Sequence, residues 1–119
     1  MKATCHCGAV ELRLDIAARD LEQPHRCDCS FCRRRAAPTV SVPLADLTVV
    51  KGADNLTLYT WGTGTAQHFF CKTCGIYTHH QRRSDPTQFG VNFGCIEGMN
   101  PAEFEPIPWS DGIHHPSDR

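Results

Sequence analysis

Alternating apolar and polar residues recur along the chain and predict a protein built mainly of β-strands. The first clear run covers residues 9–16, in which Val10, Leu12, Leu14 and Ile16 fall on one face. Period-2 alternation of this kind is typical of a strand with one buried face. The same reasoning, with turns rich in Gly, Pro, Asn and Asp between the runs, predicts further strands at residues 39–42, 47–50, 56–61, 76–80 and 89–96.

Two stretches do not follow the strand pattern. A short helix is expected within residues 29–35, where Ser30 is a suitable N-cap. From about residue 98 the chain is rich in proline, and we expect an irregular tail held to the body by Phe104 and Trp109. The elements together predict a mostly β fold of antiparallel sheets with one or two short helices. A length of 119 residues suits a single domain, residues 1–119.

Composition and charge exclude several classes of protein. A content of 40% hydrophobic and 21% charged residues indicates a folded chain rather than a disordered one. The formal net charge of −1 lacks the basic excess of nucleic-acid-binding proteins, which counts against nucleic acid as a partner. No apolar run is long enough to span a membrane. Because a cysteine motif begins at residue 5, we also expect no signal peptide and a cytoplasmic location.

The cysteines change the picture, because they are clustered. Seven of the eight lie in three groups, namely Cys5 and Cys7, then Cys27, Cys29 and Cys32, and finally Cys71 and Cys74. Disulfides are rare in the cytoplasm, and an odd number of clustered cysteines cannot pair completely. These spacings are typical of metal sites, and ligation by sulfur alone favours zinc. Iron also accepts thiolate ligands.

The position of glycine divides the seven cysteines between two ions. A glycine follows Cys7 and Cys74, and a positive φ there would let each cysteine turn close. We therefore expect Cys5, Cys7, Cys71 and Cys74 to form a closed structural zinc site. Cys27, Cys29 and Cys32 would then bind a second zinc with an open fourth position, as catalytic zinc sites do.

A histidine is the alternative fourth ligand, which would make the second site structural as well. The histidines that come into question are His6, His25, His68, His79 and His80. His79 and His80 are consecutive on a predicted strand, so at most one of them can face a given site.

Three other features each have two interpretations. Arg33–Arg35 is either a solvated helix face or a carboxylate-binding group beside the metal, since arginine pairs with carboxylates through two hydrogen bonds. Residues 61–64 form either a hairpin corner with a packed Trp61 or a substrate-binding loop. Cys95 is expected to be a small buried apolar residue, with a nucleophilic role as the alternative.

The three cysteine motifs resemble those of a known family. Cys5-His6-Cys7-Gly8-Ala9-Val10, Cys27-x-Cys29-Ser30-x-Cys32-Arg33 and Phe70-Cys71-x-x-Cys74-Gly75 are similar to motifs of the glutathione-dependent formaldehyde-activating enzymes, or S-(hydroxymethyl)glutathione synthases. That family shares its domain with a centromere protein. The resemblance covers roughly residues 3–100. It departs at Asp28, a position that is often histidine in the family, and the chain looks shorter than the formaldehyde-activating enzyme itself.

The resemblance implies a β-tent zinc-binding fold, also seen in type B methionine sulfoxide reductases. It also implies a structural zinc at Cys5, Cys7, Cys71 and Cys74 and a catalytic zinc at Cys27, Cys29 and Cys32. The function that it suggests is a zinc-dependent carbon–sulfur lyase or synthase that condenses a thiol such as glutathione with formaldehyde or a related small aldehyde.

Two alternative functions belong to other classes. The first is a non-catalytic zinc-binding module that recognises a protein or a nucleic acid, with Arg33–Arg35 and Arg82–Arg83 as a local basic patch. The second is a reductase with Cys95 as its nucleophile. The sequence pattern leaves the oligomeric state open.

Overall fold

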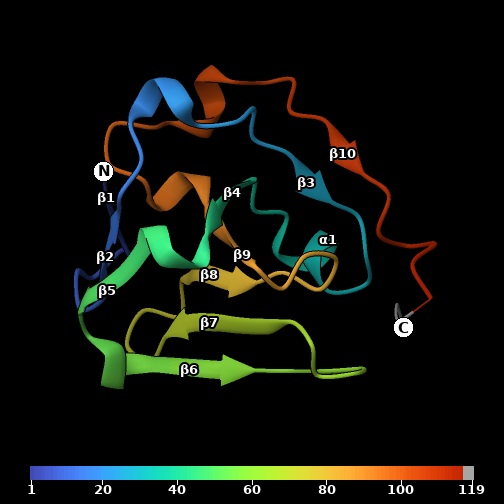
Figure 1. Cartoon of the computed structure of the whole chain (residues 1–119), viewed down its shortest axis with the longest axis horizontal. Helices are drawn as coiled ribbons and strands as arrows, with labels where there is room; N and C mark the ends of the chain where they lie inside the picture. The colour runs from blue at the N-terminus through green and yellow to red at the C-terminus, as the bar shows by residue number, and fades with distance from the viewer. Residues whose placement is uncertain (117–119) are drawn as a thin grey trace.

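The computed structural model describes residues 1–116, and its strands form three sheets (Figure 1). A three-stranded sheet has the order β1-β2-β5, with β1 (Lys2–Thr4), β2 (Glu11–Leu14) and β5 (Leu47–Lys51). A five-stranded sheet has the order β4-β9-β8-β7-β6, with β4 (Thr39–Pro43), β6 (Leu56–Tyr59), β7 (Gln67–Cys71), β8 (Tyr77–Gln81) and β9 (Gln88–Asn92). All neighbours in these two sheets are antiparallel. The expected mostly β, antiparallel fold is confirmed.

The helical elements of the described residues are short. The one α-helix is α1 (Cys32–Arg35), and the 3-10 helices are η1 (Ala18–Asp20), η2 (Leu44–Asp46), η3 (Ala53–Asn55), η4 (Phe93–Cys95) and η5 (Pro101–Glu103). The helix begins later than Ser30, and its N-cap is Phe31, which makes no side-chain capping bond. None of the helices in residues 1–116 is long and apolar enough to cross a membrane.

The hydrophobic core lies between the two larger sheets. From β2 and the turn before it, Val10, Leu12 and Leu14 are fully buried, as the alternation predicts. Val40 and Val91 from the five-stranded sheet belong to the same cluster. The core therefore joins the first strands of the chain to the sheet that carries Cys71.

The structure differs from the predicted elements in where strands end and in strands that were not expected. The strand expected at 89–96 ends at Asn92, because the Asn92 side chain accepts a hydrogen bond from the Gly94 N–H at 3.1 Å and starts the 3-10 helix η4. The strand expected at 56–61 ends at Tyr59.

Four strands were not expected, namely β1, β3 (Arg26–Cys27), β7 and β10 (Trp109–Ser110). Three of them are at most three residues long, too short a run for an alternating pattern to be visible. The five-residue β7 contains the adjacent Phe69 and Phe70, which interrupt the alternation.

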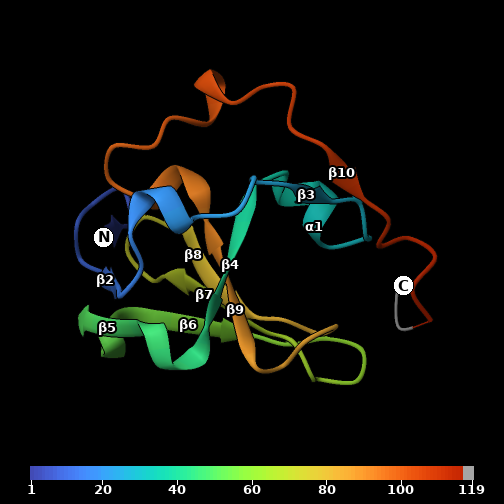
Figure 2. The same cartoon turned by 45° about the horizontal axis from the view of Figure 1, so that its top comes forward.

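The segment after residue 98 crosses the molecule and contains a short strand (Figure 2). Phe104 packs edge-on against Phe93 with ring centroids 4.8 Å apart, which supports the expected role of Phe104. Trp109 is 52% exposed and contacts the Arg26 guanidinium instead of the core. Its strand, β10 (Trp109–Ser110), pairs in parallel with β3 (Arg26–Cys27). This pairing brings residues 110–112 to the cysteine triplet.

Candidate functional site

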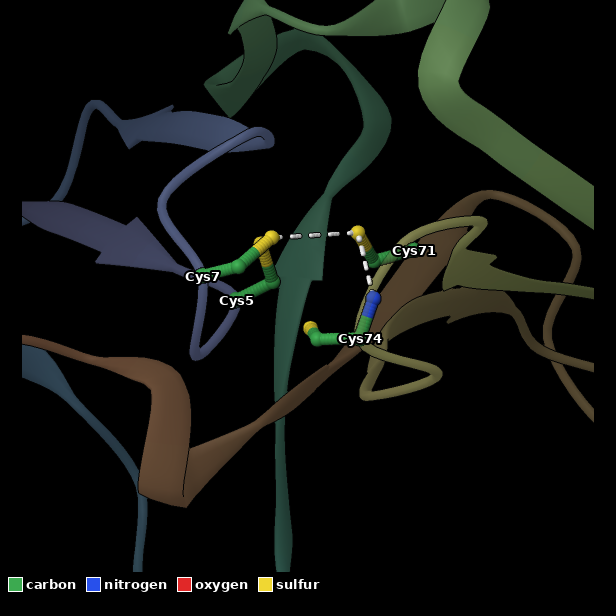
Figure 3. A group of neighbouring side chains, drawn as sticks. All are labelled: Cys5, Cys7, Cys71 and Cys74. Atoms are coloured by element: carbon green, nitrogen blue, oxygen red, sulfur yellow. Dashed lines mark hydrogen bonds between the residues drawn. The ribbon is translucent and has the colours of Figure 1, made fainter.

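Four of the cysteines come together from two distant turns (Figure 3). Cys5 and Cys7 lie between β1 and β2, whereas Cys71 ends β7 and Cys74 lies in the turn before β8. Their sulfurs are all within 4.8 Å of one another. The glycines behind both turns have the expected positive φ, 81° at Gly8 and 77° at Gly75.

The sulfur spacing of this four-sulfur cluster suits a tetrahedral metal. Four sulfurs placed tetrahedrally at about 2.3 Å from a zinc ion are about 3.8 Å apart. The observed distances are 3.7 Å from Cys5 Sγ to Cys7 Sγ and 3.7 Å from Cys7 Sγ to Cys71 Sγ. The group can hold a metal ion, and a donor set of four sulfurs is consistent with zinc.

Donated hydrogen bonds favour the thiolate form of Cys71 and Cys74 in this cluster. Cys71 Sγ accepts from the backbone N–H groups of Thr73 at 3.4 Å and Cys74 at 3.5 Å, and from Asn55 Nδ2 at 3.4 Å. The Cys74 N–H contributes most to lowering the pKa of Cys71. Backbone N–H groups also lower the pKa of Cys74, to about 6. Thiolates are the form that binds metal.

The other three cysteines form a second group, the three-sulfur cluster, at the junction of β3 and α1. Cys27 ends β3, Cys32 begins α1, and Cys29 lies between them. The three sulfurs are also within 4.8 Å of one another. Residues 1–116 place no fourth ligand atom, from a histidine or a carboxylate, within that distance of all three.

Hydrogen bonds and charge both act on the sulfurs of the three-sulfur cluster. The Cys32 N–H donates to Cys29 Sγ at 3.2 Å, and Arg35 Nη2 donates to Cys32 Sγ at 3.8 Å. Interaction with the Cys27 thiol, and then with the Cys32 thiol, holds the pKa of Cys29 far below its ordinary value. The pKa of Cys27 rises chiefly through its hydrogen bond with Cys29. The cluster therefore concentrates negative charge on Cys29.

The three-sulfur cluster opens onto a cavity of about 160 Å³. The cavity lies where α1, the β6–β7 loop, the β8–β9 loop and the tail meet. Besides the three cysteines, its lining includes Arg35, Trp61, His68, His80, Arg83 and Asp111. A small molecule in the cavity would have access to the sulfurs.

A model of the glutathione-dependent formaldehyde-activating enzyme family matches residues 1–108. The chain belongs to this family. It is also similar to a crystal structure of a Rhodobacter sphaeroides protein, with 56% sequence identity and a TM-score of 0.86. That likeness covers 92% of this chain and 100% of the other.

A cluster of aromatic rings lies beside the cavity in this family member, and two of them, His68 and His80, line it. The ring of His68 lies 4.4 Å from that of Phe31 and 5.1 Å from that of His80. Tyr77 Oη is 2.6 Å from His80 Nδ1, and the Arg35 guanidinium lies 3.5 Å above the Tyr77 ring. Burial, followed by the charge of Arg35, lowers the pKa of His68 to about 4 and holds that of His80 well below its ordinary value of 6.5. Both rings are therefore neutral at pH 7.

The candidate histidine ligands are distributed over different surroundings. His25, His68 and His80 line the cavity. His79 is buried on the other side of its strand, stacked on Phe69 at 4.7 Å, so only one of the two consecutive histidines faces the cavity. His6 is exposed.

The tail provides a wall of the site that lies outside the family match. The N–H groups of Gly112 and Ile113 donate to Asp28 Oδ1 at 2.7 and 3.1 Å. A Cβ atom at residue 112 would lie 2.4 Å from Cys27 Sγ, so only glycine fits there. We name residues 109–113 the strap. Asp28, whose role the resemblance left open, holds the strap against the three-sulfur cluster.

The basic residues singled out in the sequence divide between surface and cavity. Arg33 and Arg34 are exposed on α1, whereas Arg35, Arg82 and Arg83 line the cavity. They do not form one continuous exposed patch. Of the two interpretations of the arginine run, the solvated face applies to its first two members.

The two interpretations of residues 61–64 are both supported. Gly64 N–H donates to the Trp61 carbonyl at 3.0 Å, which closes a tight turn, and Trp61 and Thr63 line the cavity.

Cys95 has the surroundings of a structural residue. It packs against the core, and its thiol lies 3.6 Å from the Tyr77 carbonyl oxygen. Burial raises its pKa to about 12, which opposes a nucleophilic role.

Sequence reasoning missed three residues of this site. Tyr77 lies within a predicted strand, and nothing in the local pattern marks its hydroxyl as a partner of His80. Gly90 allows the His80 ring to lie against β9, where a Cβ atom would be 2.3 Å from His80 Cε1. Gly112 lies in the tail. The sequence does show a glycine at positions 90 and 112, but a glycine does not indicate which side chain will pack against it.

Proposed function

We propose that the chain catalyses the reversible addition of a small-molecule thiol, glutathione or a close analogue, to formaldehyde or a related small aldehyde. It would thus act as a carbon–sulfur lyase of the S-(hydroxymethyl)glutathione synthase type. The observation that carries the proposal is the position of Cys27, Cys29 and Cys32, whose sulfurs lie together beside a cavity and lack a fourth protein ligand among residues 1–116. Family membership supports it.

The residues have distinct roles in this proposal. Cys27, Cys29 and Cys32 would hold a zinc ion, which when bound supplies the positive charge that converts a coordinated thiol to its thiolate. Arg35 stabilises the negative charge of the cluster through Cys32. The cavity holds thiol and aldehyde together, which removes the entropic cost of their encounter.

The reaction itself needs no further cofactor. The thiol loses its proton to solvent, and its sulfur forms a bond to the carbonyl carbon. The carbonyl electron pair moves to oxygen, which takes a proton from water. The reverse sequence cleaves the carbon–sulfur bond.

The four-sulfur cluster has a structural role in the same proposal. A zinc ion held by Cys5, Cys7, Cys71 and Cys74 would join the β1–β2 turn to the end of β7. We place the protein in the cytoplasm, where reducing conditions keep cysteine thiols available for metal.

Metal content and the response to thiol test the proposal together. We expect two zinc equivalents, one for each cluster. After cobalt substitution, glutathione should change the visible spectrum of one site, and exchange between free and thiol-bound formaldehyde, followed by NMR, should accelerate. Cys29→Ser should abolish both effects, whereas Cys95→Ser, remote from the cavity, should retain them. If glutathione changes the spectrum of neither metal, the result would instead favour a zinc-binding module that recognises a protein or a nucleic acid.

A further inference from the structure

Positive charge in the cavity is not balanced by the carboxylates around it. Arg35, Arg82 and Arg83 line the cavity, and none of them forms an ion pair in the part of the chain that the structure describes. Asp111 is the one lining carboxylate among these residues, and its partner is His114 at 2.9 Å. Because Arg35 is hydrogen-bonded to Cys32, an anionic ligand would find the guanidinium groups of Arg82 and Arg83 without a competing carboxylate among the lining residues.

Two hydrogen-bond donors in the lining residues are buried without an acceptor. They are Trp61 Nε1 and Arg83 Nη1, which have no partner within residues 1–116. The Arg83 guanidinium lies 5.7 Å from the centroid of the Trp61 ring, so the two side chains are neighbours in the lining of the cavity. Buried polar groups in folded proteins are nearly always hydrogen-bonded, so an acceptor from a ligand or a water molecule is expected at these two donors.

The fold brings these donors together through strand register. Gln67 at the start of β7 pairs with Gln81 at the end of β8. The loop that carries Trp61 and the loop that carries Arg82 and Arg83 therefore lie at the same end of the β7–β8 hairpin. Cys71 lies at the opposite end of this hairpin.

Arg82 is held in a fixed orientation by neutral groups. Its Nη1 donates to Ser41 Oγ at 2.9 Å and to Gln88 Oε1 at 3.2 Å, and its Nη2 donates to Ser84 Oγ at 3.2 Å. Asp85, the nearest acid in the loop, is instead hydrogen-bonded to Thr87. The guanidinium is thus positioned by neutral acceptors. After the hydrogen bonds from Thr87, its charge also helps to lower the pKa of Asp85, but Arg82 and Asp85 form no ion pair within residues 1–116.

We propose that Trp61, Arg82 and Arg83 form an anion subsite that binds a carboxylate of the thiol substrate. A guanidinium binds a carboxylate through paired charge-assisted hydrogen bonds, and an indole N–H adds a neutral donor. The inference rests on the proposed function in one respect, since formaldehyde has no charge and the carboxylate must come with the thiol. In this proposal the two loops determine specificity for acidic thiols, and the three-sulfur cluster binds the sulfur of the substrate.

Binding of S-methylglutathione separates this subsite from thiol chemistry, because the thioether retains the carboxylates but has no ionisable thiol. Trp109→Phe leaves Trp61 as the one fluorescent tryptophan, whose emission should change on titration with S-methylglutathione. In metal-loaded protein, Arg83→Gln should weaken this binding by about tenfold, equivalent to about 1.4 kcal/mol. Calorimetry should show a smaller loss for Trp61→Phe, which keeps the ring and removes the N–H.

Matched controls distinguish the subsite from a general charge effect. Arg33→Gln removes an exposed arginine on α1 and should leave the affinity unchanged, and Arg83→Lys should restore only part of it. Binding of 2-mercaptoethanol, a thiol without a carboxylate, should be insensitive to Arg83→Gln. Circular dichroism of each variant checks that the fold is retained.

Three outcomes would overturn the subsite: no binding of S-methylglutathione to the wild type, unchanged affinity in Arg83→Gln, or an equal loss in Arg33→Gln. Inorganic phosphate that competes as well as the carboxylate ligand would also overturn its assignment as a carboxylate site. If S-methylglutathione binds in an Arg83-dependent manner but glutathione produces no response at the metal, the subsite stands and the proposed reaction fails. If glutathione changes the spectrum of the metal but Arg83→Gln leaves the affinity for S-methylglutathione unchanged, the subsite fails and the proposed reaction stands.

Discussion

The two cysteine clusters use the same side chain in opposite settings. The four-sulfur cluster lies at the Cys71 end of the β7–β8 hairpin and unites two turns that are far apart in sequence. The three-sulfur cluster lies near the other end, between β3 and α1, and borders a cavity lined by arginine and aromatic side chains. The number of sulfurs and their exposure to a cavity, not the chemistry of the thiol, separate a closed site from one that can accept a ligand.

The largest effect should come from breaking the four-sulfur cluster. We expect Cys71→Ser to cost more than about 3 kcal/mol and to lower the thermal midpoint by more than about 10 °C, because metal binding at a structural site contributes directly to folding. Cys29→Ser should lower the midpoint by less than about 5 °C. Calorimetric unfolding of both variants beside the wild type measures the difference. Equal losses would show that both clusters are structural.

The four-sulfur cluster could be predicted from sequence because its information is local. Each half is a short motif followed by a glycine, and Gly8 and Gly75 have the positive φ that the motif requires. The mostly β fold was predictable for a similar reason, since Val10, Leu12 and Leu14 alternate within one strand.

The surroundings of the three-sulfur cluster could not be predicted in this way. They depend on contacts between residues far apart in the chain, such as Arg83 over Trp61 and the Gly112 N–H on Asp28. No periodicity records such contacts. The last strand was predicted to be too long for a local reason. Asn92 is compatible both with the middle of a strand and with a helix N-cap, and the sequence alone does not decide between them.

Acidification should reveal the contribution of His79, which lies on the side of β8 away from the cavity. Burial lowers the pKa of His79 from 6.5 to about 4. The unfolded chain therefore binds this proton at a higher pH than the folded chain does, and the stabilising contribution, complete above about pH 6.5, is lost as the pH falls towards 4. At about 1.4 kcal/mol per pKa unit, the loss approaches 3 kcal/mol.

His79→Phe isolates this contribution, because phenylalanine retains the stacking on Phe69. Urea unfolding at pH 7.5, 5.5 and 4.5 should show a smaller loss of stability on acidification in the variant than in the wild type. Metal ligands also take up protons at low pH, but they do so in both proteins. Parallel pH profiles of the two would contradict the assignment to His79.

The smallest effect should come from releasing the strap, which exists at the three-sulfur cluster alone. Asp28→Ala removes the acceptor of the Gly112 and Ile113 N–H groups, each bond contributing about 1 kcal/mol. Hydrogen exchange at these two amides should accelerate about tenfold or more, while the thermal midpoint set by the four-sulfur cluster changes little. Asp28→Asn keeps an Oδ1 acceptor and should restore most of the protection. Unchanged exchange in Asp28→Ala would show that β10 pairing and the fit of Gly112 against Cys27 hold the strap without the carboxylate, and that the wall of the cavity is fixed by packing.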